Sequence, residues 1–123
     1  MAYLLEIDNE KNLMTITYDQ TSTYADRTHV LDEVISHLKD DPTTNILIDA
    51  RAAENTLTTE EQIEFGKILG NNSMYFRENK TAVLKSKSLH PVVLAEAFMN
   101  GHSHLVEFES RKEACQWLLG ALR

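Results

Sequence analysis

The stretch Asp40-Asp41-Pro42-Thr43-Thr44-Asn45-Ile46-Leu47-Ile48-Asp49 decides the fold, because a helix must end and a buried strand must begin within it. Proline pushes the residue before it out of the helical region, so the two aspartates and Pro42 mark a helix end. Residues 46–48 are apolar without alternation, which is typical of a strand covered on both faces. The stretch therefore predicts a parallel sheet with helices packed on it.

The segment before this stretch predicts two strands and a helix. Residues 2–7 and 13–18 are rich in aromatic and β-branched side chains, and the polar run 8–12 between them indicates a hairpin turn. In the second strand one face is the more apolar, because Leu13, Thr15 and Thr17 alternate with Met14, Ile16 and Tyr18. From Ser22 an apolar stripe at helical spacing predicts a helix, capped by Thr21, Ser22 or Thr23; the stripe comprises Tyr24, Leu31, Val34, Ile35 and Leu38.

The segment after it alternates helices and strands. A helix begins at one of two overlapping capping boxes, Thr58 with Glu61 or Thr59 with Gln62, and runs to about Leu69. The run Gly70-Asn71-Asn72 then supplies residues that tolerate a left-handed C-cap; the alternative is another helical turn at Met74-Tyr75-Phe76 before the next strand.

Three further elements complete the chain. Strands are expected at 81–84 and 105–108, with a helix over 92–99 between them. A last helix follows the capping box that Ser110 and Glu113 form, and its apolar stripe is Ala114, Trp117, Leu118, Ala121 and Leu122.

The predicted order is ββαβαβαβα, which makes the fold class α/β. Strict alternation after the hairpin predicts a five-stranded, mainly parallel sheet with four helices and an N-terminal antiparallel β-hairpin. No linker, repeat or low-complexity tract interrupts residues 1–123, so a single domain is expected.

Composition excludes several classes of protein. The formal charge of −7 disfavours nucleic acid and anionic membranes as partners. The single Cys115 permits no internal disulfide, and no apolar run is long enough to span a membrane, so a cytoplasmic location is expected. The charge is uneven, because residues 1–64 carry −10 and residues 65–123 carry +3.

Two groups of residues are candidates for binding. Asp49 and Arg51 stand where the strand over 45–49 ends, and ligands of parallel sheets collect at that edge. The alternative is a local bond from Asp49 to the backbone, with Arg51 paired to one of the many nearby acids. Thr58 and Thr59 at the following helix start would favour an added phosphate, although capping alone explains them. The second group is a basic rim that would hold an anion, or else a solvated face: Arg77, Lys80, Lys85 and Lys87.

No motif indicates catalysis, a metal or a cofactor. His102 and His104 are two alternating ligands where zinc needs three or four, and no nucleophile motif or phosphate-binding glycine loop is present. We therefore expect no catalytic residue, no metal site and no cofactor.

The order of elements and three sequence segments resemble the STAS-like superfamily, the fold of bacterial anti-sigma-factor antagonists, and especially its short, divergent stand-alone members. The segments are Ile48-Asp49-Ala50-Arg51, Asn100-Gly101 and Phe108-Glu109-Ser110-x-x-Glu113-Ala114-x-x-Trp117-Leu118. The resemblance implies sequential strands and a binding module without catalysis. Regulatory members carry a phosphorylated Ser or Thr at the helix after the third strand. This chain lacks their Asp-Ser-Ser-Gly motif, and Thr58 and Thr59 are its nearest hydroxyls.

Two functions follow as expectations. The first is a regulatory module that docks a protein partner through Asp49, Arg51, Thr58 and Thr59. The second is a carrier of a small lipid-like or anionic ligand. A homodimer is left open, and the partner, the ligand and the pathway are not indicated by the residues.

Overall fold

The structure is a computed structural model that describes residues 2–53, 57–84 and 105–120. The described part of the chain forms one five-stranded sheet, three α-helices and two 3₁₀ turns. The strands are β1 (Tyr3–Asp8), β2 (Leu13–Tyr18), β3 (Asn45–Asp49), β4 (Thr81–Leu84) and β5 (Leu105–Phe108). The helices are α1 (Tyr24–Asp40), α2 (Thr59–Asn71) and α4 (Arg111–Leu118), and the 3₁₀ turns are η1 (Arg51–Ala53) and η2 (Ser73–Phe76).

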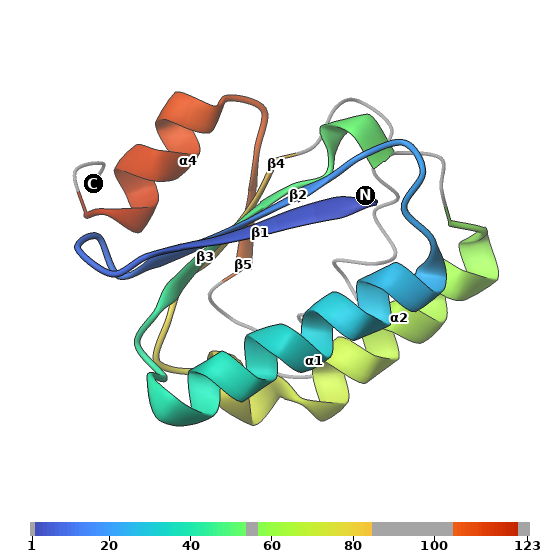
Figure 1. Ribbon diagram of the computed structural model, residues 1–123, viewed down its shortest axis with the longest axis horizontal. Coiled ribbons are helices and arrows are strands. Elements are labelled where there is room, and N and C mark those ends of the chain that lie inside the picture. The colour runs from blue at the N-terminus through green and yellow to red at the C-terminus, as the bar shows by residue number, and fades with distance from the viewer. Residues whose placement is uncertain (1, 54–56, 85–104, 121–123) are drawn as a thin grey trace.

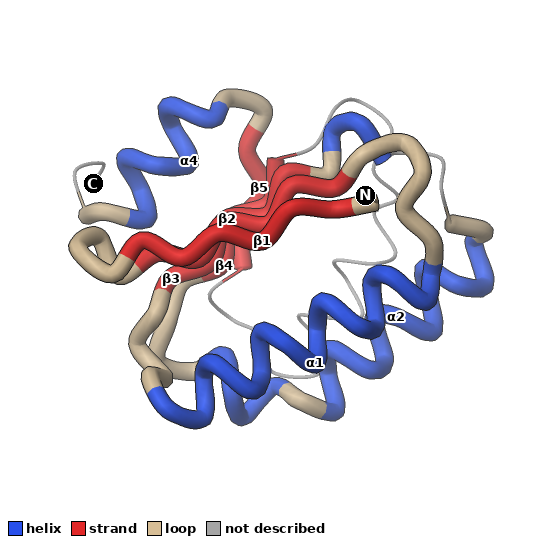
Figure 2. Tube along the Cα trace, viewed as in Figure 1, coloured by secondary structure: helices blue, strands red, loops and turns tan. Residues whose placement is uncertain are grey.

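The sheet confirms the α/β class and the N-terminal antiparallel hairpin. Its strands lie in the order β1-β2-β3-β4-β5, with β1 antiparallel to β2 and every other neighbouring pair parallel. Because β2 to β5 run the same way, their carboxyl ends meet at one edge of the sheet. The strand β1 lies at the side of the sheet, so one of its long edges faces outward (Figure 2).

The described helices cover the two faces unequally. The helices α1 and α2 lie together on one face, and α4 lies on the other (Figure 1). The larger core, on the α1 side, contains Met14, Ile16 and Tyr18 from β2, as their alternation predicts. The smaller core lies under α4 and includes Leu47, which is fully buried, while its neighbour Ile46 is buried on the other face. The prediction that β3 is covered on both faces is therefore confirmed.

Local hydrogen bonds explain the hairpin turn. The Asp8 carboxylate accepts from the backbone N–H groups of Glu10 and Lys11, at 3.1 and 3.2 Å. Asn12 closes the turn at φ 52°, a left-handed conformation that asparagine tolerates better than most residues. Its side-chain amide donates to the Thr43 carbonyl at 3.1 Å, which ties the turn to the start of β3.

Each described helix begins at a hydroxyl cap. Of the three hydroxyls expected to cap α1, Thr23 does so, with Asp26 completing a capping box. Of the two boxes open at α2, Thr58 and Glu61 form the one observed. In α4 the Ser110 hydroxyl accepts from the Glu113 N–H at 3.4 Å. In each helix one of the otherwise unsatisfied amides of the first turn thus gains a partner.

The predicted left-handed C-cap of α2 is wrong. The helix continues beyond Leu69 to Asn71, and the capping residue Asn72 has φ −108°. Its side-chain amide donates to the Ile68 carbonyl at 2.8 Å, and its backbone N–H bonds the Ile68 and Leu69 carbonyls. Because these bonds satisfy the last carbonyls, no left-handed residue is needed before the chain enters η2.

The terminal helix is attached to the sheet by polar side chains as well as by its apolar stripe. The Asn45 amide donates to the Leu118 carbonyl at 2.8 Å, while its oxygen accepts from the Lys80 N–H at 2.8 Å. One side chain thereby joins β3, the start of β4 and α4. The expected helix over 92–99 and the stripe residues Ala121 and Leu122 lie outside the described residues, so the count of four helices stays a prediction.

Candidate functional site

Asp49 and Arg51 lie together at the carboxyl edge of the sheet. The Arg51 guanidinium donates two hydrogen bonds to the Asp49 carboxylate, from Nε to Oδ1 at 3.0 Å and from Nη2 to Oδ2 at 2.7 Å. The Arg51 backbone N–H adds a third bond to Oδ1 at 3.2 Å. Arg111, the first residue of α4, places its Nη1 3.9 Å from Oδ2. Two guanidinium groups therefore share one carboxylate, so these three side chains together carry a net positive charge.

This pairing decides what Asp49 can do chemically. The hydrogen bonds from Arg51 lower the pKa of the Asp49 carboxyl, and burial opposes them only in part. A carboxylate with a lowered pKa is a weak general base. The local alternative is thus observed: the Asp49 carboxylate bonds the backbone, and the acid that pairs with Arg51 is Asp49 itself.

Thr58 and Thr59 occupy different positions at the start of α2. The Thr58 hydroxyl accepts from the Glu61 N–H at 3.1 Å, and the Glu61 carboxylate accepts from the Thr58 N–H at 2.9 Å. Thr59 is the first helical residue and is exposed. Both glutamates of the first turn, Glu60 and Glu61, already place negative charge at the positive end of the helix dipole. A phosphate on Thr58 would break the capping box, whereas Thr59 is exposed and lies outside that box.

The expected basic rim is only partly described. Arg77 and Lys80 precede β4, and Lys85 and Lys87 lie outside the described residues. Lys80 is committed to α4, because its Nζ donates to the Trp117 carbonyl at 3.2 Å and lies 5.3 Å from the centre of the Trp117 ring. Its ammonium therefore serves the attachment of α4.

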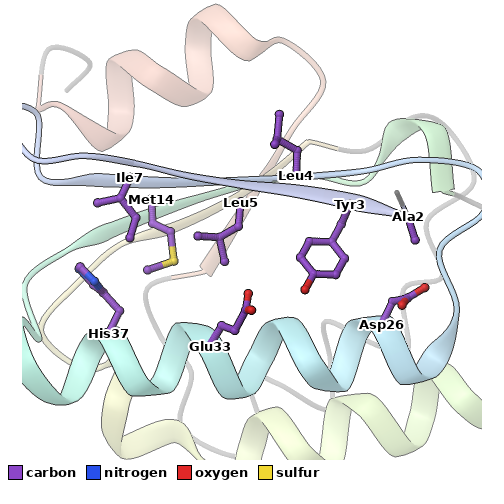
Figure 3. Close-up of a pocket in the computed structure, with 9 residues that line it drawn as sticks. All are labelled: Ala2, Tyr3, Leu4, Leu5, Ile7, Met14, Asp26, Glu33 and His37. Carbon is purple, nitrogen blue, oxygen red and sulfur yellow. The ribbon is translucent and has the colours of Figure 1, made fainter.

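A groove that the sequence did not indicate lies between β1 and α1. Its volume is about 630 Å³. Figure 3 shows Tyr3 and Leu5 pointing from β1 toward α1, with Glu33 rising from the helix to meet them. Among the described residues, the lining comprises Ala2, Tyr3, Leu4, Leu5, Ile7, Met14, Asp26, Glu33 and His37. The groove thus has an apolar strand side and a polar helix side.

The polar side of the groove is mainly acidic. The pKa of the Tyr3 hydroxyl is raised, first by loss of water and then by the negative charges of Glu33 and Asp26. Glu33 also pairs with His29 at 3.3 Å, and His37 is held by Thr44, whose hydroxyl lies 3.0 Å from its Nε2. Two carboxylates therefore act on the same groove from one helix.

The outer edge of β1 carries free backbone groups. The Asp19 N–H donates to the Ala2 carbonyl at 3.0 Å, which marks these two as a hydrogen-bonded pair of the antiparallel ladder. Such pairs alternate, so Leu4, Glu6 and Asp8 bond β2, and the intervening residues turn their N–H and C=O groups outward. No described residue of the chain pairs with this outer edge.

Other kinds of site are not found among residues 2–53, 57–84 and 105–120. They contain no cluster of three or more His, Cys, Asp or Glu side chains that could hold a metal ion. No helix in the same residues is long and apolar enough to cross a membrane. His102 and His104 lie outside this part of the chain.

Comparison of the chain with models of protein families, with curated proteins and with solved structures found no match.

Two signals in the sequence point to the groove in retrospect. Leu4 and Ile7 are large apolar residues three positions apart in the first strand. Their side chains therefore lie on opposite faces of the strand and cannot both enter one core. They are 48% and 44% exposed. Asp26 and Glu33 are seven residues apart, which places both carboxylates on one side of the predicted helix. Neither signal shows by itself that the strand would lie at the side of the sheet.

Proposed function

We propose that this chain is a non-enzymatic docking module of the STAS-like type, which binds a protein partner along β1. The observation that carries the proposal is the outer edge of β1 beside the groove, with which no described residue pairs. An unpaired strand edge offers backbone donors and acceptors, and the exposed Leu4 and Ile7 add apolar contact area. The resemblance on which the type rests implies a bacterial, cytoplasmic setting and no catalysis.

The chemistry of the carboxyl edge supports a role in binding more than one in catalysis. Asp49 is held as a carboxylate by Arg51, and no second acid or nucleophile contacts it among the described residues. The surface expected from the sequence, made by Asp49, Arg51, Thr58 and Thr59, is the competing docking surface. It offers a positive edge and an exposed hydroxyl, but its strongest groups are already bonded to each other.

A carrier of a small ligand is the second candidate, and the groove is the observation that favours it. A volume of about 630 Å³ falls within the range typical of small-molecule sites, roughly 300 to 1,000 Å³. The two carboxylates would repel an anionic head group, so the groove suits a neutral or cationic lipid-like molecule. The anionic version of the carrier would instead use the edge at Arg51 and Arg111.

Site-specific photo-crosslinking separates these functions. A benzophenone side chain is placed at Ile7, at Thr59 or at Met74, which is exposed on η2 and serves as the matched control. Irradiation in the native cell extract should yield an adduct of protein mass at Ile7 and none at Met74. An adduct at Thr59 and none at Ile7 would show that the partner binds the competing surface instead of β1.

Native mass spectrometry of the freshly purified chain tests the carrier directly. Docking predicts the mass of the bare chain after purification. A co-purified species of small-molecule mass, together with no adduct at Ile7, would replace the docking proposal with the carrier.

A further inference from the structure

We infer that the partner adds a strand to β1 and that this strand carries basic side chains among apolar ones. The inference rests on the proposed docking function and names the chemistry of its partner. Three observations support it: the direction of the free backbone groups, the composition of the groove, and the charge around it.

The backbone of β1 is prepared for one more strand. Leu5 and Ile7 direct their N–H and C=O groups away from β2, while Leu4 and Glu6 are bonded within the hairpin. An added strand would take up the outward groups at the usual spacing of about 4.8 Å. Main-chain bonds of this kind supply affinity, and alternate side chains supply specificity.

The groove determines which side chains suit that strand. A side chain of the added strand on the α1 side would lie over Leu5 and reach toward Glu33 and Asp26 (Figure 3). Lysine and arginine suit both the apolar strand side and the acidic helix side of the groove, because their stems are apolar and their heads are positively charged. Asp26 and Glu33 are separated by about 10 Å of helix, and same-face residues of a strand repeat every ~6.8 Å. Residues two or four positions apart are about 7 or 14 Å apart, on either side of that separation, and the long flexible stems of two basic residues span the difference.

The charges of the neighbouring elements favour a basic partner over a second copy of this chain. Glu6 and Asp8 on β1 and Glu10 in the turn add to the two carboxylates of the groove. The opposing cations on these elements are Lys11 in the turn and Arg27 and Lys39 on α1. Arg27 is turned inward, with its guanidinium 4.3 Å from the centre of the Tyr18 ring and a bond to the Ala53 carbonyl. Pairing β1 with β1 of a second copy would bring the acids of both copies together.

Hydrogen exchange with a designed peptide tests the inference. The probe is a nine-residue peptide of alternating lysine and valine, and its control has glutamate in place of lysine. At ten times its Kd, the lysine peptide should slow exchange of the Leu5 and Ile7 amides about tenfold, whereas the Leu4 and Glu6 amides should change little. The glutamate peptide should leave all four unchanged. Alternate backbone nitrogens of the lysine peptide can be methylated in two ways. Methylating the set that faces β1 should abolish the slower exchange, and methylating the set that faces away should leave it.

A matched pair of variants tests the charge. Glu33→Gln should weaken binding of the lysine peptide about threefold to fivefold, and Asp32→Asn, an equal charge change on an exposed neighbour, by less than about 1.5-fold. Equal effects would refute the role of the groove carboxylates.

The remaining outcomes separate this inference from the docking function. Binding without slower exchange at Leu5 and Ile7 would refute strand addition, and slower exchange that rises with protein concentration alone would identify a second copy as the occupant. If an adduct forms at Ile7 in the extract but the lysine peptide does not bind, docking holds and the strand chemistry is wrong. If neither occurs, both proposals fail.

Discussion

At the scale of single residues, Tyr18 is a buried hydroxyl whose ionisation is coupled to stability. Burial raises its pKa to about 12, although Arg27 over the ring opposes the shift. In the unfolded chain a tyrosine ionises near pH 10, so between pH 10 and 12 the folded state binds more protons. Stability is therefore lost as pH rises through this interval, by roughly 2 to 3 kcal/mol from this group.

The variant Tyr18→Phe should remove this loss. Urea unfolding of both proteins at a series of pH values measures it as the difference between their free energies of unfolding. The difference should be flat below pH 10 and should shift in favour of the variant between pH 10 and 12. A difference that stays flat up to pH 12 would contradict the assignment.

The Asp49 pair titrates at the opposite end of the pH scale. Its lowered pKa means that its contribution is present above the ordinary aspartate pKa and disappears as pH falls through the folded value. Arg51→Gln should raise the Asp49 pKa, and Arg111→Gln should raise it less, because that guanidinium lies 3.9 Å away. Carboxyl-carbon NMR titration of Asp49 measures both shifts, and the reverse order would disprove the pairing.

At the scale of elements, the start of α2 offers two adjacent threonines with different roles. Thr58 is bonded in the capping box and Thr59 is exposed, so Thr58→Ala should lower the free energy of unfolding by about 1 kcal/mol. Thr59→Ala should change it by less than about 0.5 kcal/mol. Thermal and urea unfolding at pH 7 provide the comparison. Equal losses would mean that the cap alternates between the two residues.

The elements themselves could largely be predicted, since the signals that define them are local. The capping hydroxyls, Pro42 and the apolar run 46–48 act within a few residues of their own positions. The left-handed C-cap failed because Asn72 satisfied the carbonyls with its side chain, a choice that depends on rotamer and not on composition. The bonds of Asn45 to α4 and to the start of β4 join residues 35 and 73 positions apart, and no local pattern encodes them.

The candidate site was less predictable for the same reason. An ion pair of Arg51 with a nearby acid is expected from the sequence, but the sequence does not say that the acid is Asp49, two residues away. The groove needs β1 to lie at the side of the sheet and α1 to cross beside it. That arrangement depends on which strands pair, and pairing is set by the fold as a whole.

At the scale of the whole molecule, the two cores share the same central strands. Met14 and Leu13 are neighbours in β2 but belong to the α1 core and the α4 core, respectively. The only tryptophan, Trp117, packs against Phe108 with ring centres 5.6 Å apart. Its fluorescence therefore reports the packing of α4 on the sheet. Because the strands connect both sides, we expect the unfolding of one side to accompany the unfolding of the other.

Coincident transitions would demonstrate this coupling. Urea unfolding followed by Trp117 fluorescence and by far-ultraviolet circular dichroism should give the same midpoint and the same slope. A fluorescence transition that precedes the loss of helix signal would show that α4 leaves the sheet separately.

The sequential order of the strands has a consequence for how the chain is made. As the polypeptide leaves the ribosome, β1 and β2 can form their hairpin first, and each later strand can join at the side that is still growing. No strand has to be inserted between two that have already paired. The hairpin side can therefore form before β3 to β5 have been translated, and the partner proposed for β1 would already meet that edge on the nascent chain.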